Sequence, residues 1–142
     1  MSLIFRAGPL RCALPIDEVI ETMRPLRIRP LAATPVFVPG ISIMRGVPVP
    51  VVDMATLLAG EPGAVSRFVA VRTGRGPVAL ATGDVLGVRH TDAADRHDAV
   101  PGGAFRQLVA AVGTMDSEPL LVLHSMRLLP DEVWAAAAAA GS

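Results

Sequence analysis

The chain has 142 residues, 51% of them hydrophobic, and its 13 basic and 13 acidic side chains cancel to a formal net charge of zero. This length suits one domain, or two very small ones that share an interface. Without a basic excess, nucleic-acid binding is not expected. No apolar stretch reaches the roughly 20 residues that span a bilayer, so direct membrane insertion is not expected either. The single cysteine, Cys12, excludes an internal disulfide and, with no secretory signal apparent, predicts a cytoplasmic protein.

Prolines and glycines, 13 of each, are spread along the chain and separate short apolar runs. Aromatic residues make up only 4% of the sequence, so Val, Leu, Ile and Ala must fill the interior. Short runs of β-branched residues bounded by Pro and Gly are typical of strands. The composition therefore predicts an all-β barrel or sandwich.

The N-terminal region predicts a hairpin followed by an ambiguous segment. Leu3–Phe5 and Cys12–Leu14 flank the turn Ala7-Gly8-Pro9, which indicates two paired strands. Apolar side chains then recur with helical spacing from Ile16 to Met23, and this periodicity alone predicts a two-turn helix stopped by a proline. The alternating, basic stretch Leu26–Ala32 is expected as a strand edge or connector with one face in solvent.

The most specific stretch runs from Thr34 to Leu58. Its apolar runs Val36–Val38, Ile41–Met44 and Val47–Val52 predict short strands that prolines restrict to edges, bulges or strand starts. Between the last two runs, Arg45-Gly46 places a lone charge before a residue that is free to take a positive φ.

A short helix is expected after these strands. Asp53 is placed to N-cap Met54–Ala59, and Gly60 supplies a left-handed C-terminal stop. The remaining elements are expected in the following order: a linker at Gly60–Gly63, a hairpin of Arg67–Thr73 and Pro77–Thr82 around Gly74-Arg75-Gly76, a strand at Val85–His90, an exposed loop at Thr91–Gly103, a hairpin of Phe105–Met115 and Leu120–His124, a short helix at Ser125–Leu129, and a helix at Asp131–Ala140 whose six alanines give little anchorage, so that it frays.

Several of these residues follow the signature of a known family. The residues that match its core pattern, P-x-x-x-x-G-x-x-N-L-R-G-x-x-x-P-V-x-D-L, are Pro35, Gly40, Met44, Arg45, Gly46, Pro50, Val51, Asp53 and Met54. An upstream pattern is matched by Ala13, Leu14, Pro15, Ile16, Val19, Glu21 and Arg24. On these residues the chain resembles the CheW-like chemotaxis coupling protein family, from about Phe5 to Leu129. It departs from the family pattern at Cys12, Ile43, Gly83 and His124.

The resemblance implies a fold of two small SH3-like five-stranded β-barrels packed together, with short helices after each barrel. We expect residues 1–63 to form the first barrel and residues 64–142 the second, with terminal strands that can be exchanged between the two. For the ambiguous segment, the resemblance implies one helical turn near Asp17 and then a strand through Met23. We adopt that prediction because the segment is too short to be a stable helix on propensity.

The resemblance also implies a function. It suggests a non-enzymatic adaptor, without a cofactor or metal, that couples the cytoplasmic tip of a chemoreceptor to the regulatory domain of a CheA-type histidine kinase. A helical receptor hairpin would bind in an apolar groove between the barrels, and apolar barrel surface would pair with the kinase. The expected partner-binding residues are Val36, Val38, Gly40, Ile41, Ile43, Met44, Arg45 and Gly46. The alternatives are a divergent CheW-like domain that serves another two-component pathway, or a His/Asp metal-dependent enzyme with its site at His90–Asp98.

Residues that could carry chemistry have simpler structural roles. His90–Asp98 lacks a metal-ligand spacing and reads as a solvated loop. His124-Ser125 has no surrounding nucleophile motif, and the glycines around Arg75 mark a turn. Arg45 is the exception, because an unpaired arginine within apolar strands is costly to bury. It either closes an internal ion pair, to Asp53 or Glu21, or lies where a partner covers it; both hold if the ion pair orients the guanidinium.

Overall fold

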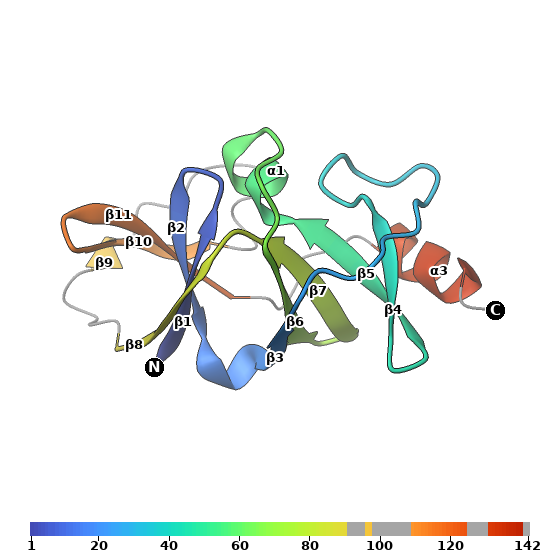
Figure 1. Cartoon of the computed structure of the whole chain (residues 1–142), viewed down its shortest axis with the longest axis horizontal. Helices are drawn as coiled ribbons and strands as arrows, with labels where there is room; N and C mark the ends of the chain where they lie inside the picture. The colour runs from blue at the N-terminus through green and yellow to red at the C-terminus, as the bar shows by residue number, and fades with distance from the viewer. Residues whose placement is uncertain (91–95, 98–108, 125–130, 141–142) are drawn as a thin grey trace.

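The computed structural model describes residues 1–90, 96–97, 109–124 and 131–140, and this part of the chain is mostly β (Figure 1). The predicted all-β class is therefore confirmed. The elements in chain order are β1 (Ser2–Ala7), β2 (Leu10–Pro15), the 3-10 turn η1 (Ile16–Glu18), β3 (Val19–Met23), β4 (Gly40–Met44), β5 (Val47–Asp53), α1 (Met54–Ala59), β6 (Arg67–Thr73), β7 (Gly76–Thr82), β8 (Val85–Arg89), β9 (Arg96–His97), β10 (Val109–Met115), β11 (Glu118–Leu123) and α3 (Asp131–Ala140).

The ambiguous segment after β2 forms η1 and then β3, so the helix indicated by its periodicity is wrong. Burial alternates along β3: Val19 and Met23 are half-buried, each against a different core cluster, whereas Ile20 is 42% exposed. This alternation is that of a strand, because successive side chains of a strand point to opposite faces. The apolar residues of the segment therefore do not share the single face that a helix would require.

Two further predictions need correction. Val36–Val38 is not a strand: the backbone N–H of Val38 donates to the carbonyl of Pro35 at 2.9 Å and closes a turn. The exposed loop predicted for Thr91–Gly103 contains the short strand β9, which pairs with β10. The other residues of that loop lie outside the described residues, and so does the helix expected at Ser125–Leu129.

The helix after β5 forms with the predicted bounds and caps. The carboxylate of Asp53 accepts a hydrogen bond from the backbone N–H of Thr56 at 3.3 Å, and Gly60 has φ 83°. One side of α1 is buried through Met54, Ala55 and Leu58. The helix therefore inserts apolar side chains into the core while its polar ends are satisfied locally.

The strands form two sheets that each combine distant parts of the chain. One sheet has the order β8-β1-β2-β11-β10-β9, and the other has the order β3-β6-β7-β5-β4. Most neighbours are antiparallel, but β2 pairs in parallel with β11, and β5 pairs in parallel with β7. The strand pairing cuts across the expected division at residues 63 and 64, because β1 and β2 lie in the same sheet as β8–β11. The sequence prediction allowed for terminal strands exchanged between the two units; that exchange and the division into two units stay predictions.

The edges of the five-stranded sheet are joined by the connector that leaves β3. Backbone hydrogen bonds of 2.7 and 2.9 Å link Arg29 to Ile41 of β4, at the opposite edge of the sheet. Gly40 permits this approach, because a Cβ at this position would lie 1.9 Å from the carbonyl oxygen of Arg29. The sheet therefore curls until the connector from one edge strand reaches the other edge strand.

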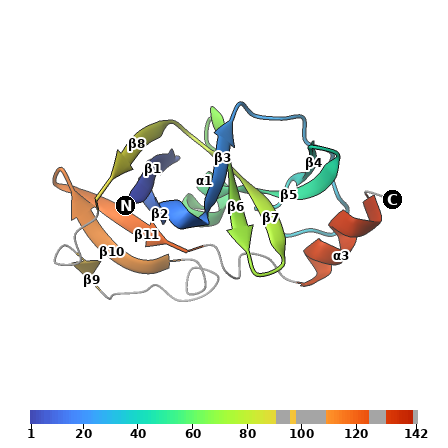
Figure 2. The same cartoon turned by 90° about the horizontal axis from the view of Figure 1, so that it is seen from below.

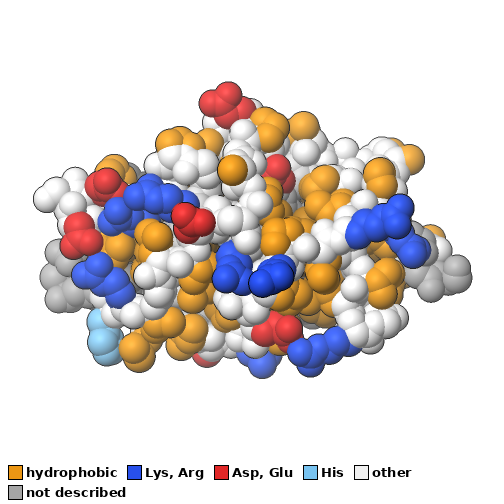
Figure 3. Space-filling model, viewed as in Figure 1, with side chains coloured by type: hydrophobic (Ala, Val, Ile, Leu, Met, Phe, Trp, Pro, Cys, Tyr) orange, Lys and Arg blue, Asp and Glu red, His pale blue; other side chains and the backbone are white. Residues whose placement is uncertain are grey.

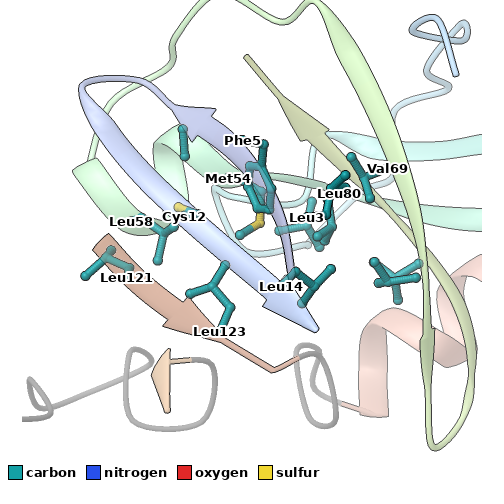
Figure 4. Close-up of a cluster of buried hydrophobic side chains, with 14 of the residues drawn as sticks. Leu3, Phe5, Cys12, Leu14, Met54, Leu58, Val69, Leu80, Leu121 and Leu123 are labelled. Atoms are coloured by element: carbon teal, nitrogen blue, oxygen red, sulfur yellow. The ribbon is translucent and has the colours of Figure 1, made fainter. Parts of the chain in front are cut away.

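A shared core lies between the two sheets and holds them together (Figure 4). Figure 4 shows Met54 and Leu58 of α1 among side chains of β1, β2 and β11 on one side and Val69 and Leu80 on the other. The fully buried side chains of this cluster include Phe5, Cys12, Leu14, Val52, Met54, Val71, Val78 and Leu80. Burial raises the pKa of the Cys12 thiol to about 12, because the low-polarity surroundings disfavour the thiolate.

Each sheet also has a second buried face. Val49, Val51 and Phe68 form a separate cluster within the five-stranded sheet, and Ile4, Ala13 and Leu120 form one within the other. Because both faces are buried, these strands read as nearly continuous apolar runs, not as clean alternations. This is consistent with an SH3-like curled architecture for both units.

The C-terminal helix α3 packs beside β5 of the five-stranded sheet, as the view from below also shows (Figure 2). Val133 and Ala137 are buried, so the helix has more apolar anchorage than its alanine-rich sequence suggests. Trp134 faces Gly76, and the guanidinium of Arg75 lies 5.9 Å from the centroid of its ring and forms an ion pair with Asp131. These contacts fix the helix to the β6–β7 turn.

Candidate partner-binding surface

The β4–β5 hairpin carries the residues that the sequence singles out for partner binding. Its two-residue turn consists of Arg45 at φ 53° and Gly46 at φ 78°. Two consecutive positive φ values match the twist of the paired strands and keep such a hairpin tight. The turn therefore holds the backbone of Arg45 in a fixed place at the end of β4 and β5, where its side chain extends from the sheet.

Arg45 forms an ion pair with Glu21 of β3, with 2.5 Å between the Nη2 and Oε2 atoms. Asp53, the other expected partner, instead caps α1. The Arg45 side chain is 81% exposed and that of Glu21 is 32% exposed. The ion pair is thus a surface contact that orients the guanidinium, and most of the guanidinium remains accessible to a partner.

The eight expected partner-binding residues divide into two groups. Val36, Ile43, Met44, Arg45 and Gly46 are exposed or half-buried, with Val36 at 85% and Ile43 at 40%. Val38, Gly40 and Ile41 are buried, so their side chains do not reach the surface. Their roles are structural: Val38 and Ile41 are core residues, and Gly40 leaves room for the backbone of the connector at Arg29. Partner binding by the exposed group stays a prediction.

One exposed apolar residue of this hairpin was missing from the sequence prediction. Val47, the first residue of β5, is 50% exposed and pairs with Met44 across the turn. Its place directly after Gly46 was the available signal, because the first residue of a strand after a tight turn often lies beyond the core. We define the hairpin patch as Ile43, Met44, Arg45, Gly46 and Val47.

A second surface lies where the two sheets meet. An open groove of about 860 Å³ is lined by Arg24, Pro25, Ser66, Arg67, Asp84, Val85 and Leu86. These residues come from the end of β3 and from the starts of β6 and β8. In Figure 3, basic side chains lie in the middle of this face with apolar side chains around them, over the region where β3, β6 and β8 converge. We call this the inter-sheet groove.

The other residues considered for chemistry form no catalytic arrangement in the described part of the chain. No group of three or more His, Cys, Asp or Glu side chains with metal-binding geometry occurs among the described residues. His124 is half-buried and lines a small surface pocket with Pro15, Asp17, Glu18 and Arg72. The glycines around Arg75 form the β6–β7 turn. Most of the predicted His90–Asp98 site lies outside the described residues, and no described helix is long and apolar enough to cross a membrane.

Comparisons with known proteins agree with this architecture. The family model described as CheW-like domain matches residues 2–133. The chain is 35% identical over 131 residues to Protein FrzA of Myxococcus xanthus, covering 88% of this chain and 82% of that protein. It is similar in structure to the scaffolding protein TtCheW from Thermoanaerobacter tengcongensis, with a TM-score of 0.76 and 21% identity over 89% of this chain and 90% of the other. At that identity the structural likeness concerns the fold.

Proposed function

Because this chain belongs to the CheW-like domain family, we propose that it is a non-enzymatic, cytoplasmic adaptor in chemotaxis-type signalling. In this proposal it couples the cytoplasmic tip of a chemoreceptor to the regulatory domain of a CheA-type histidine kinase. The observation that carries the proposal is the presence of two separate accessible surfaces, the hairpin patch and the inter-sheet groove, on a single pair of packed sheets. An adaptor requires two such surfaces.

The hairpin patch is the surface that we assign to the kinase. It combines exposed apolar side chains with one arginine whose guanidinium is held by Glu21. Interface centres are commonly enriched in arginine and in apolar anchors that are well ordered before binding. A regulatory domain with its own curled sheets would present strand ends of similar shape, so that two such ends can pack together.

The inter-sheet groove is the surface that we assign to the receptor. Its lining includes the apolar side chains of Val85 and Leu86, and Leu86 is 46% exposed. Amphipathic helices bind grooves of this kind by laying their apolar face against the floor. The two-helix tip of a receptor would therefore supply one helix to the groove.

The experiment that tests this proposal is reconstitution of a ternary complex. Purified adaptor is mixed with the regulatory domain of the CheA-type kinase and the receptor cytoplasmic fragment from the same bacterium, and the assembly is followed by size-exclusion chromatography with light scattering. We expect each binary complex to form and the two partners to bind simultaneously. The coupling function would be contradicted if the adaptor failed to bind one of the two partners, or if binding of the kinase prevented binding of the receptor. An adaptor that binds only kinase would point instead to a CheW-like domain of another two-component pathway.

A further inference from the structure

All 13 basic residues are arginines, and the described ones differ in whether they have a counter-charge. Five form ion pairs with carboxylates: Arg6, Arg11, Arg45, Arg75 and Arg89. Arg72 donates to the carbonyl of Asp17. Among the arginines whose side chains the structure describes, four form no ion pair with a described carboxylate: Arg24, Arg27, Arg29 and Arg67. These four arginines lie on the connector after β3 and at the start of β6. The chain as a whole is neutral, but this part of its surface is therefore positively charged.

Arg24 and Arg67 are the next residues beyond the last pair of the β3–β6 ladder. Met23 pairs with Phe68 in antiparallel register, and the next position outward places Arg24 opposite Arg67. Arg67 shares its strand face with Val69 and Val71, which pack in the core between the sheets. Both arginines line the inter-sheet groove. Like charges directly across a strand pair destabilise it, and a carboxylate between them would reverse that effect.

The groove contains one carboxylate of its own, which is hydrogen-bonded to a serine of the groove and not ion-paired with either arginine. Asp84 accepts a hydrogen bond from the hydroxyl of Ser66 at 2.9 Å and forms no ion pair with Arg24 or Arg67. Beside it, Val85 and Leu86 present apolar surface. The groove therefore has a cationic wall and an apolar wall, which is the pattern that complements an amphipathic, acidic segment.

The apolar wall is also poorly suited to an extended peptide. The pairing of β8 with β1 shifts register between Ile4 and Phe5, at the position of Leu86, and Gly87 has φ 125°. A bulge at this point interrupts the regular edge that an added strand would need. Helical segments need no such edge, because their backbone hydrogen bonds are satisfied internally.

We propose that the inter-sheet groove binds an acidic amphipathic helix, whose apolar face contacts Val85 and Leu86 and whose carboxylate is held between Arg24 and Arg67. The inference rests on the proposed function, in which this groove receives the receptor tip, and it adds the chemistry by which the tip is recognised. Two guanidinium groups can each offer paired N–H donors to one carboxylate. On the helix, the carboxylate stands three or four residues from an apolar anchor.

The test compares arginines inside and outside the groove. Arg24→Gln, Arg67→Gln and the control Arg27→Gln are prepared, because Arg27 is exposed and forms no ion pair with a described carboxylate but does not line the groove. Affinity for the receptor cytoplasmic fragment and for the kinase regulatory domain is measured by calorimetry at about 50 and 500 mM salt. We expect each groove variant to weaken receptor binding about tenfold or more and to flatten its salt dependence. Arg27→Gln should change receptor binding less than about twofold, and all three variants should keep kinase affinity.

Charge reversal identifies the acidic partner residue. Arg67→Glu should abolish receptor binding, and a receptor fragment with one tip Glu changed to Arg should restore it. If wild-type protein binds the receptor but the groove variants behave like Arg27→Gln, this inference is wrong and the proposed function survives. If wild-type protein binds no receptor fragment, the proposed function fails together with the inference. Binding of wild-type protein to phosphatidylglycerol vesicles that Arg24→Gln and Arg67→Gln abolish, with receptor binding unchanged, would assign the groove to a membrane and overturn the helix proposal.

Discussion

Arg45→Ala removes a guanidinium that is ion-paired and yet mostly in solvent. The contact to Glu21 is short, 2.5 Å, but the Arg45 side chain is 81% exposed. Ion pairs with this exposure contribute about 0 to 1 kcal/mol to the free energy of unfolding, because water and salt screen them. For a chain of this length, we therefore expect the melting temperature to fall by no more than about 2–4 °C. The left-handed φ of 53° disfavours Arg and Ala alike, so the backbone adds no difference.

Binding to the kinase regulatory domain should respond far more strongly. An ordered arginine at the centre of an interface commonly contributes about 2 kcal/mol or more, which corresponds to about a 30-fold rise in Kd. Arg45→Lys should recover only part of this loss, because an ammonium group lacks the planar fork. Arg89→Ala is the matched control, since Arg89 is also exposed and ion-paired, to Asp116 at 3.1 Å, but lies on β8 of the other sheet.

Thermal melts and calorimetric titrations on these three variants decide between the roles. A loss of about 3 kcal/mol or more in the free energy of unfolding for Arg45→Ala would show that the ion pair is structural, contrary to its exposure. An unchanged melt together with unchanged kinase and receptor affinity would remove Arg45 from the partner-binding surface. A double-mutant cycle with Glu21→Ala separates orientation from contact: if Glu21 only orients the guanidinium, Glu21→Ala should weaken kinase binding less than Arg45→Ala does.

Three further predictions concern the scaffold. Gly40→Ala should lower the free energy of unfolding, measured by chemical denaturation, by about 3 kcal/mol. The alanine Cβ would lie 1.9 Å from the carbonyl oxygen of Arg29 and would break the two hydrogen bonds that join the sheet edges. A loss below about 1 kcal/mol would contradict this prediction. Asp53→Ala should cost about 1 kcal/mol through the lost cap of α1, whereas Asp53→Asn should cost much less. Burial raises the pKa of Cys12 from 9.0 to about 12, so the native thiol should resist alkylation at pH 8. The free energy of unfolding should fall as the pH rises above 9, because the thiol ionises more readily in the unfolded chain. Cys12→Ala should lose less free energy of unfolding over this pH range, and the same pH dependence in both proteins would refute the assignment.

Much of the fold was predictable because turns and caps are local. Asp53, Gly60 and the Arg45-Gly46 turn act within a few residues, so their sequence spacing alone fixed the helix α1 and the β4–β5 hairpin. The Ile16–Met23 segment was misleading because apolar residues at helical spacing can also occur in a strand. There, β3 packs Val19 against one core cluster and Met23 against another, and exposes Ile20. Its correct prediction came from the family resemblance.

The candidate site was predictable only in part, because burial depends on contacts between distant segments. The run Val36–Met44 reads as one apolar surface in sequence, yet Val38 and Ile41 are core residues and Val36 is exposed. What separates them is contact with distant segments: Val38 packs in the core between the sheets, and Ile41 pairs with Arg29 of the connector. The family resemblance predicted a groove between the barrels, but the residues that line it could not be predicted, for the same reason. Arg24 and Arg67 become neighbours only through the pairing of β3 with β6.

The parallel pairing of β2 with β11 has a consequence for how the protein is made. On the ribosome, the β1–β2 hairpin emerges long before β11, the strand with which β2 pairs. The five-stranded sheet, by contrast, uses only residues 19–82 and can assemble while translation continues. Until β11 arrives, β1 can pair with β8 but the other edge of β2 has no partner strand, and such delayed long-range pairing is slow and prone to aggregation. Nascent chains arrested before β11 should therefore bind general chaperones more strongly than the released protein does.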